Sequence, residues 1–112
     1  MNHAQIARLL NSVPATTEQR HRKRVEGYAF TAGRVETRID SLRLELELAL
    51  RGVDDAVPEG RGDDAADKAL ALALNLDSLE RIQPRVDSWL RVAVSSVSED
   101  QGLAPFGEGP TA

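Results

Sequence analysis

The stretch LRLELELAL, residues 42–50, decides which secondary structure this chain forms. Leucine occupies every second position, and on a β-strand this spacing would place all five leucines on one face. The intervening Arg, Glu and Ala residues favour a helix, and the stretch contains no β-branched residue. We therefore predict a helix here, with an amphipathic strand as the alternative.

The surrounding residues support the helix because they carry a heptad pattern. Apolar or small residues recur at alternating steps of three and four, at Val25, Tyr28, Ala32, Val35, Ile39, Leu42, Leu46 and Ala49. A repeat sustained over more than three heptads is typical of a helix that packs one face against another helix. Thr16 and Gln19 have the spacing of a capping box at its start, and Gly52 is expected to end it.

A second alternating stretch, LALALNL at residues 70–76, lies in the other predicted long helix. Turn residues at 53–64 predict a loop before it, with Asp63 or Asp64 as the N-cap. The apolar stripe of this helix continues through Leu79, Ile82, Val86, Trp89, Leu90, Ala93 and Val97. Pro84 lies in the middle of the stripe and is expected to kink or split the helix.

Together these patterns predict an all-α fold. A short N-terminal helix at residues 3–13 precedes a long antiparallel helical hairpin whose second arm is kinked at Pro84. Residues 1–98 are expected to form one domain, followed by a disordered tail at 99–112 that is rich in Gly, Pro and acidic residues. Folding about residue 58 would pair Leu46 with Leu70, Leu42 with Leu74, and Tyr28 with Trp89, the last pair as core.

Composition excludes several classes of protein. The 112 residues include no cysteine, so disulfides, thiol nucleophiles and thiolate metal sites are excluded. We find no signal peptide and no apolar run of membrane-spanning length, so we expect a cytoplasmic protein without a membrane partner. The excess of Arg over Lys is typical of a GC-rich genome and suggests a bacterial or phage origin.

Charge is distributed unevenly along the chain. Residues 1–51 carry nine Arg and Lys against six Asp and Glu, a balance of +3, whereas residues 52–112 carry five against twelve, a balance of −7. Two arms of opposite sign attract each other when they fold together, which is a structural explanation of the asymmetry. The asymmetry also argues against a uniformly anionic partner such as duplex DNA.

The leucine-rich stretches suggest that the protein binds other chains. Both lie near the predicted loop, where the hairpin is apolar around most of its circumference and needs further burial. The short N-terminal helix is expected to cover one face, and a second copy or another protein would cover the rest. The predicted partner-binding residues are Phe30, Leu44, Leu48, Leu70 and Leu74. The predicted class is an adaptor, small chaperone, antiactivator or assembly factor that forms a homodimer or larger helical bundle, and not an enzyme.

Nucleic-acid binding is the alternative function. The segment RHRKR, residues 20–24, supplies Arg20, Arg22, Lys23 and Arg24 as candidate phosphate contacts. On a helix, however, consecutive residues spread around the axis, and no aromatic residue is interleaved for base stacking. A solvated, salt-bridging helix start explains the same residues.

A metal site is the lesser alternative. Glu18 and His21 have the Glu-x-x-His spacing that places two ligands on one helix face, and Glu99 of the antiparallel arm would supply a third. A second such motif is absent from the chain, and arginines crowd the first. We therefore expect no metal and no other cofactor, with Glu18 complementing the helix N-terminus instead.

Overall fold

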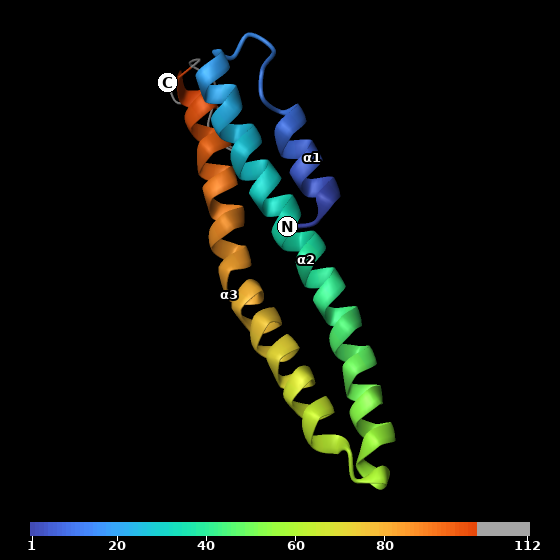
Figure 1. Cartoon of the computed structure of the whole chain (residues 1–112). Helices are drawn as coiled ribbons and strands as arrows, with labels where there is room; N and C mark the ends of the chain where they lie inside the picture. Colours follow the sequence, from blue (N-terminus) through green and yellow to red (C-terminus); the bar gives the residue numbers. More distant parts are fainter. Residues whose placement is uncertain (101–112) are drawn as a thin grey trace. The chain divides into compact units, whose positions relative to one another are not determined.

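The computed structural model describes the backbone of residues 1–100 and the side chains of residues 1–97. Its α-helices are α1 (His3–Asn11), α2 (Gln19–Ala56) and α3 (Gly62–Asp100), and a 3-10 turn, η1 (Val57–Glu59), precedes α3 (Figure 1). The predicted helical hairpin with a short N-terminal helix is confirmed. The strand alternative for residues 42–50 is wrong, because this stretch lies within α2. None of the described helices combines the length and apolarity needed to cross a membrane.

The described residues divide into two compact units. The three-helix unit, residues 1–36 with 83–100, contains α1, the first half of α2 and the second half of α3. The two-helix unit, residues 37–82, contains the remaining halves of α2 and α3 and the turn that joins them. Helix α1 therefore belongs to only one of the two units, whereas α2 and α3 extend through both.

The core of the three-helix unit forms where α1 meets α2 and α3. Its buried side chains are Ile6, Leu9, Val25, Ala29, Ala32, Val86, Leu90, Ala93, Val94 and Val97. The heptad positions of α2 in this unit are thus buried or packed against the core, as predicted. Tyr28 and Trp89 meet with ring centroids 6.5 Å apart, which confirms their predicted pairing. Trp89 nevertheless stays 44% exposed, so its prediction as a core residue is wrong.

Polar contacts attach α1 to the unit. Asn2 and Gln5 form a capping box, in which each side chain accepts a hydrogen bond of 2.8 Å from the other residue's backbone N–H. The Met1 ammonium group lies 2.5 Å from Oδ2 of Asp87 on α3, and both side chains are at least nine-tenths buried. The guanidinium of Arg22 donates to the carbonyls of Pro14 and Ala15, each at 3.0 Å, and so holds the segment between α1 and α2.

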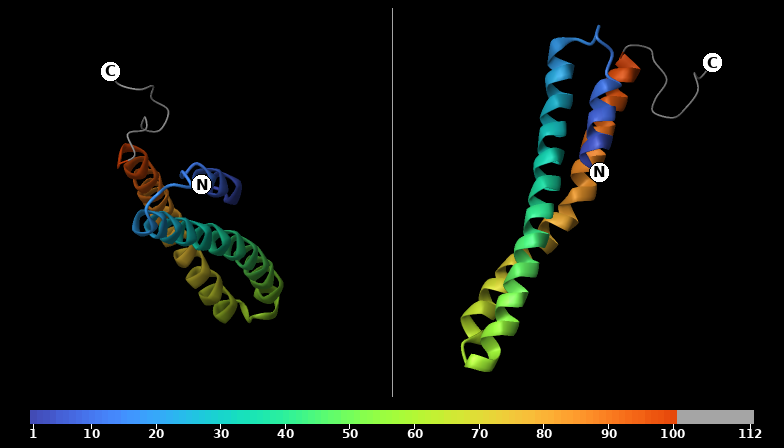
Figure 2. Two further views of the ribbon diagram at one scale, coloured as in Figure 1. Left: turned by 90° about the horizontal axis from the view of Figure 1, so that it is seen from above. Right: turned by 90° about the vertical axis from the view of Figure 1, so that its right-hand side faces the viewer.

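In the two-helix unit, α2 and α3 run side by side in opposite directions (Figure 2). Ile39 and Leu42 on α2 are almost completely buried, and Ala69 on α3 is buried as well. The half-buried residues Leu72, Leu76 and Leu79 continue the packed face of α3, again at steps of three and four. Arg43 and Glu80 form an ion pair of 3.5 Å between the two helices.

This packed face differs from the one predicted for α3. Leu70 and Leu74 were expected opposite Leu46 and Leu42, but they are 58% and 59% exposed and lie outside the buried face. The leucines that face α2 are the intervening ones, Leu72 and Leu76. The predicted pairings of Leu46 with Leu70 and of Leu42 with Leu74 are therefore wrong.

The turn is shorter than predicted. Gly52 does not end α2, which continues to Ala56. Pro58 has no N–H to continue the α-helical hydrogen bonds, and residues 57–59 form the 3-10 turn η1 instead. Two hydrogen bonds, from the Gly60 N–H to the Val57 carbonyl (3.0 Å) and from the Arg61 N–H to the Ala56 carbonyl (3.1 Å), form a Schellman motif. Gly60 has the positive φ of 71° that this motif needs at its end.

Three other predicted boundaries shift. Helix α2 begins at Gln19, so its N-cap is Glu18 and not the predicted Thr16. The carbonyl of Glu18 accepts hydrogen bonds from the N–H groups of His21 and Arg22. Helix α3 begins at Gly62, so Asp63 and Asp64 lie in its first turn instead of capping it. It continues through Pro84 to Asp100, which excludes a split, while the kink stays a prediction. The tail predicted at 99–112 lies outside the described side chains, and beyond residue 100 outside the described backbone.

Replacing glycines in α2 and in the turn is expected to have opposite effects on stability. Gly27 and Gly52 lie inside α2 with open space around an added Cβ, so Gly27→Ala and Gly52→Ala should each raise the free energy of unfolding by about 0.5–1 kcal/mol. Gly60→Ala places a Cβ on left-handed backbone and should lower it by about 1–2 kcal/mol. Urea unfolding followed by circular dichroism checks both signs. A gain for Gly60→Ala would contradict the Schellman motif.

Candidate protein interface

Large exposed hydrophobic side chains gather in the two-helix unit. Six of them are between 51% and 59% exposed, namely Leu44, Leu48, Leu50, Val57, Leu70 and Leu74, and Ile82 is 39% exposed. In the three-helix unit, the same kind of residue is limited to Phe30, Trp89 and Val92 within the described part. The unit without a third helix thus exposes most of the apolar surface. Four of the five predicted partner-binding residues belong to it.

On α2, Leu44 and Leu48 form one of two exposed pairs, here called the α2 leucine pair. Leu44 is two residues from both Leu42, which is fully buried, and Leu46, which is half-buried. Two residues advance a helix by roughly 200°, so Leu44 lies on the side of α2 opposite its packed face. Leu48 follows one turn later on the same side. The α2 leucine pair therefore points away from α3.

On α3, Leu70 and Leu74 form the corresponding α3 leucine pair. They alternate with Leu72 and Leu76 of the packed face, so the same geometry directs them away from α2. Because each pair points away from the other helix, the two pairs lie on opposite outer sides of the two-helix unit. A single partner helix can cover only one pair, so the two pairs form two separate surfaces.

Charged residues surround both pairs. On α2, Arg51 follows Leu48 by three residues and lies 2.7 Å from Glu47. On α3, Asp67 precedes Leu70 by three residues and Asp77 follows Leu74 by three, so acids stand at both ends of that pair. Asp77 lies 3.0 Å from Arg81. A rim of charges around an apolar centre is typical of protein interfaces.

Phe30, the fifth predicted partner residue, belongs to the three-helix unit. Its ring is 67% exposed, and the guanidinium carbon of Arg34 lies 5.7 Å from the ring centroid. This cation–π contact covers part of the ring from its own helix. Phe30 is therefore not part of either leucine pair.

The basic segment predicted as a nucleic-acid contact occupies the first turns of α2. Arg22 is half-buried and bonded to the carbonyls of Pro14 and Ala15. Arg20 contacts Glu18 with its Nε 3.3 Å from Oε2, whereas Lys23 and Arg24 are exposed. Cations also repel the positive end of a helix dipole, where these residues lie. The structure thus gives Arg22 a structural role and leaves three exposed cations.

The proposed metal ligands do not form a site among the described residues. Glu18 and His21 do approach each other, with Oε2 of Glu18 3.5 Å from Nε2 of His21, but Oε2 of Glu18 also meets Arg20. Glu99, the third candidate, lies outside the described side chains. No group of three or more His, Asp and Glu side chains among the described residues is suited to hold a metal ion.

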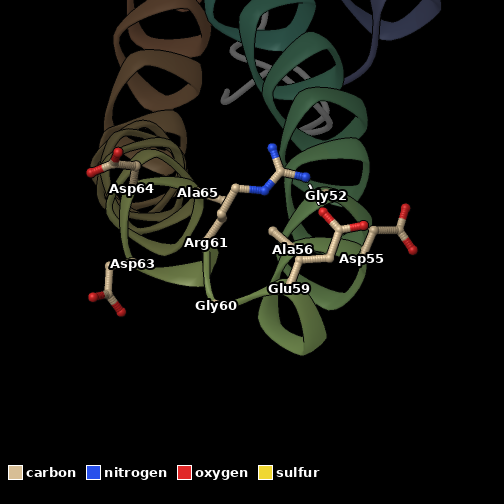
Figure 3. Close-up of a pocket in the computed structure, with 9 residues that line it drawn as sticks. All are labelled: Gly52, Asp55, Ala56, Glu59, Gly60, Arg61, Asp63, Asp64 and Ala65. Carbon is tan, nitrogen blue, oxygen red and sulfur yellow. Dashed lines mark hydrogen bonds and ion pairs between the residues drawn. The ribbon is translucent and has the colours of Figure 1, made fainter.

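The turn between α2 and α3 carries an open hollow between the ends of the two helices (Figure 3). Arg61 extends across it and forms an ion pair with Glu59. Asp63 and Asp64 line the side of α3, where their charges complement the positive end of its dipole. These charges are therefore explained by helix and turn stability.

The sequence did not reveal two features of these surfaces. Val57 was missed, because Gly52 was expected to end α2 and the following residues to form a loop, and Leu50 was not named among the partner residues. The buried Asp87 was missed as well, although an acid inside an apolar stripe is a signal that a cation lies nearby. Comparisons of the chain with protein-family models, with curated proteins and with solved structures find no match.

Proposed function

We propose that this chain is a protein-interaction module that buries its α2 and α3 leucine pairs against helices of partner chains. The observation that carries the proposal is the contrast between the two units. Helix α1 covers the three-helix unit, whereas in the two-helix unit leucines more than half exposed stand on both outer sides. Apolar surface of this kind on a folded chain is typical of a binding site.

The size of the surface supports reversible binding. Full burial of an exposed leucine contributes about 1.5–3 kcal/mol, so a half-exposed one contributes about half of that. Association itself costs at least 4 kcal/mol in lost freedom of motion. The two residues of one pair therefore need help from neighbours such as Leu50 or from the charged rim. This module would work by binding, as an adaptor, small chaperone, antiactivator or assembly factor does, and not by catalysis.

The proposal is tested by removing all four leucines together. In the quadruple variant Leu44→Gln, Leu48→Gln, Leu70→Gln and Leu74→Gln, we expect capture of partner chains from an extract of the source cells to fall at least tenfold. Glutamine keeps helix propensity, so circular dichroism should remain unchanged. Quantitative mass spectrometry of the captured chains, this chain included, is the measurement.

A matched control comes from the other unit. Val92 is 61% exposed in the three-helix unit, so Val92→Gln removes an exposed hydrophobic side chain without touching either leucine pair. Its captured chains should match those of the unchanged protein. Equal capture by the quadruple variant and by Val92→Gln would refute the proposed function.

A further inference from the structure

The outer side of the first half of α2 carries a surface that the proposed function does not use. Helical geometry brings five exposed side chains to this side within residues 19–36, namely Arg20, Lys23, Arg24, Phe30 and Arg34. The buried residues Val25, Ala29 and Ala32 mark the opposite side of the same helix, where α1 and α3 pack. The five exposed residues, here called the basic face, extend over about 21 Å along the helix.

Structural contacts explain the cations of the basic face only in part. Arg20 lies 3.3 Å from Glu18, whereas Lys23, Arg24 and Arg34 form no ion pair with any residue that the structure describes. Lys23 and Arg24 follow Arg20 by three and four residues, a spacing at which like charges repel and destabilise a helix. Cations in the first turn also oppose the helix dipole. An anionic ligand on this face would compensate both effects.

Acidic residues lie outside the basic face. Within residues 19–36 they are Glu26 and Glu36. Glu26 borders the face, roughly 40° around the helix from Phe30, and Oε2 of Glu36 accepts a hydrogen bond of 2.5 Å from Nε2 of Gln83 on α3. Residues 19–36 thus hold five Arg and Lys against two acids, a balance of +3, whereas residues 37–82 hold six against eleven, a balance of −5. This half of α2 is therefore basic although the whole chain is acidic.

Phe30 indicates which anionic partner fits. Its ring is 67% exposed although the guanidinium carbon of Arg34 lies 5.7 Å from the ring centroid. It is the one large apolar side chain on this face within the described residues 19–36. Protein interfaces have an apolar centre, and membrane-binding helices bury a whole apolar face, so one ring among cations suits neither. Proteins bind single strands of nucleic acid with cations for the phosphates and aromatic rings for the bases.

We propose that the basic face binds single-stranded nucleic acid, with its cations against phosphates and Phe30 against a base. Single strands fit better than a duplex, because their bases are free to stack on a side chain. The surface differs from the one predicted from residues 20–24, since Arg22 is bonded within the fold and Phe30 and Arg34 join it. The inference goes beyond the proposed function, because it uses the three-helix unit and leaves both leucine pairs free.

Fluorescence anisotropy of a labelled single strand measures the binding, with RNA and DNA of about 15 nucleotides titrated separately with the full chain. Each phosphate that a cation neutralises contributes roughly −0.7 to the slope of log K against log salt concentration. Removing two cations, in Lys23→Gln with Arg34→Gln, should therefore weaken binding at least tenfold at low salt and make the slope shallower by about 1.4. The matched control, Arg85→Gln with Arg91→Gln, removes two exposed cations from α3 of the same unit and should change binding less than about threefold.

A second pair of variants tests the ring. Phe30→Leu keeps an apolar side chain but cannot stack on a base as a ring does, so it should weaken binding at least fivefold. The salt slope should stay unchanged, because no phosphate contact is lost. Phe30→Tyr keeps the ring and should bind like the unchanged protein. A loss in Phe30→Tyr as large as that in Phe30→Leu would contradict stacking.

Three outcomes would overturn the proposal. The first is that neither strand binds at about 0.1 mM protein in low salt, because non-specific binding is usually tighter than that. The second is an equal loss in the two double variants, because net charge and not the basic face would then carry the binding. The third is binding of phosphatidylserine vesicles or polyglutamate in place of the strands, which would assign the face to a membrane or to an acidic protein. The quadruple leucine variant should keep its strand binding, so failure here and failure of the proposed function are distinguishable.

Discussion

Leu42→Ala is expected to lower the free energy of unfolding by about 3–5 kcal/mol, because it leaves a cavity where a fully buried side chain stood. The two-helix unit has little else to hold it together. Its most buried residues are Ile39, Leu42 and Ala69, and α1 belongs to the other unit. Domains of this size are stable by about 5–15 kcal/mol, so the loss is a large fraction of the total.

Urea unfolding followed by circular dichroism measures the loss, and Leu44→Ala provides the control. Leu44 lies two residues away on the same helix but is 59% exposed, so its truncation should change the free energy of unfolding by less than about 1 kcal/mol. Amide hydrogen exchange shows which part of the chain loses stability. Protection should fall within residues 37–82 first, because local unfolding follows compact units. Equal losses for Leu42→Ala and Leu44→Ala would contradict the burial described for α2.

The packed face of α2 was predicted correctly, whereas that of α3 was not. On α2 the heptad from Val25 to Ala49 is buried or half-buried at each of its positions. The stretch LALALNL on α3 repeats every two residues and therefore contains two sets of leucines. Leu72 and Leu76 are the set in step with the stripe that continues through Leu79, so the register was present in the sequence, although the predicted pairing used the other set.

Helix ends show which local signals outweigh others. Glycine inside a helix costs only about 1 kcal/mol, and packing of the next turn, where Val53 and Ala56 are half-buried, offsets that cost at Gly52. Proline lacks the N–H that the next helical hydrogen bond needs, so Pro58 was the better stop signal. For the interface, Leu44 and Leu48 fall outside the heptad predicted on α2, and both are exposed. The prediction that α1 covers a leucine-rich face was wrong, because α1 packs in the three-helix unit.

The position of α1 depends on a contact that no local pattern predicts. Met1 and Asp87 are 86 residues apart in the chain, and their charged groups lie 2.5 Å apart in a largely buried environment. A helical pattern in the first residues predicts that α1 forms but not where it packs. The buried carboxylate of Asp87 on α3 adds to the packing of Ile6 and Leu9, because the Met1 ammonium compensates its burial.

Asp87→Ala is expected to lower the free energy of unfolding by about 3 kcal/mol and to loosen α1. Removing one partner of a buried ion pair leaves the other charge buried without compensation, at a cost of about 3–5 kcal/mol. The Met1 ammonium can escape to water if the first residues detach, and this escape limits the loss to the lower value. Urea unfolding measures the loss, and trypsin cleavage after Arg8 on α1 should become faster.

Two further substitutions separate the ion pair from other effects of the change. Asp87→Asn keeps the shape and one acceptor oxygen, so its loss should fall between those of Asp87→Ala and the unchanged protein. Asp77→Ala removes an exposed carboxylate that lies 3.0 Å from Arg81, and exposed pairs contribute less than about 1 kcal/mol. If Asp87→Ala cost no more than Asp77→Ala and left cleavage after Arg8 unchanged, the buried pair would not be what positions α1. If Asp87→Ala lowered the free energy of unfolding more than Asp77→Ala and made cleavage after Arg8 faster, Asp87 would be identified as a residue that holds α1 in the three-helix unit.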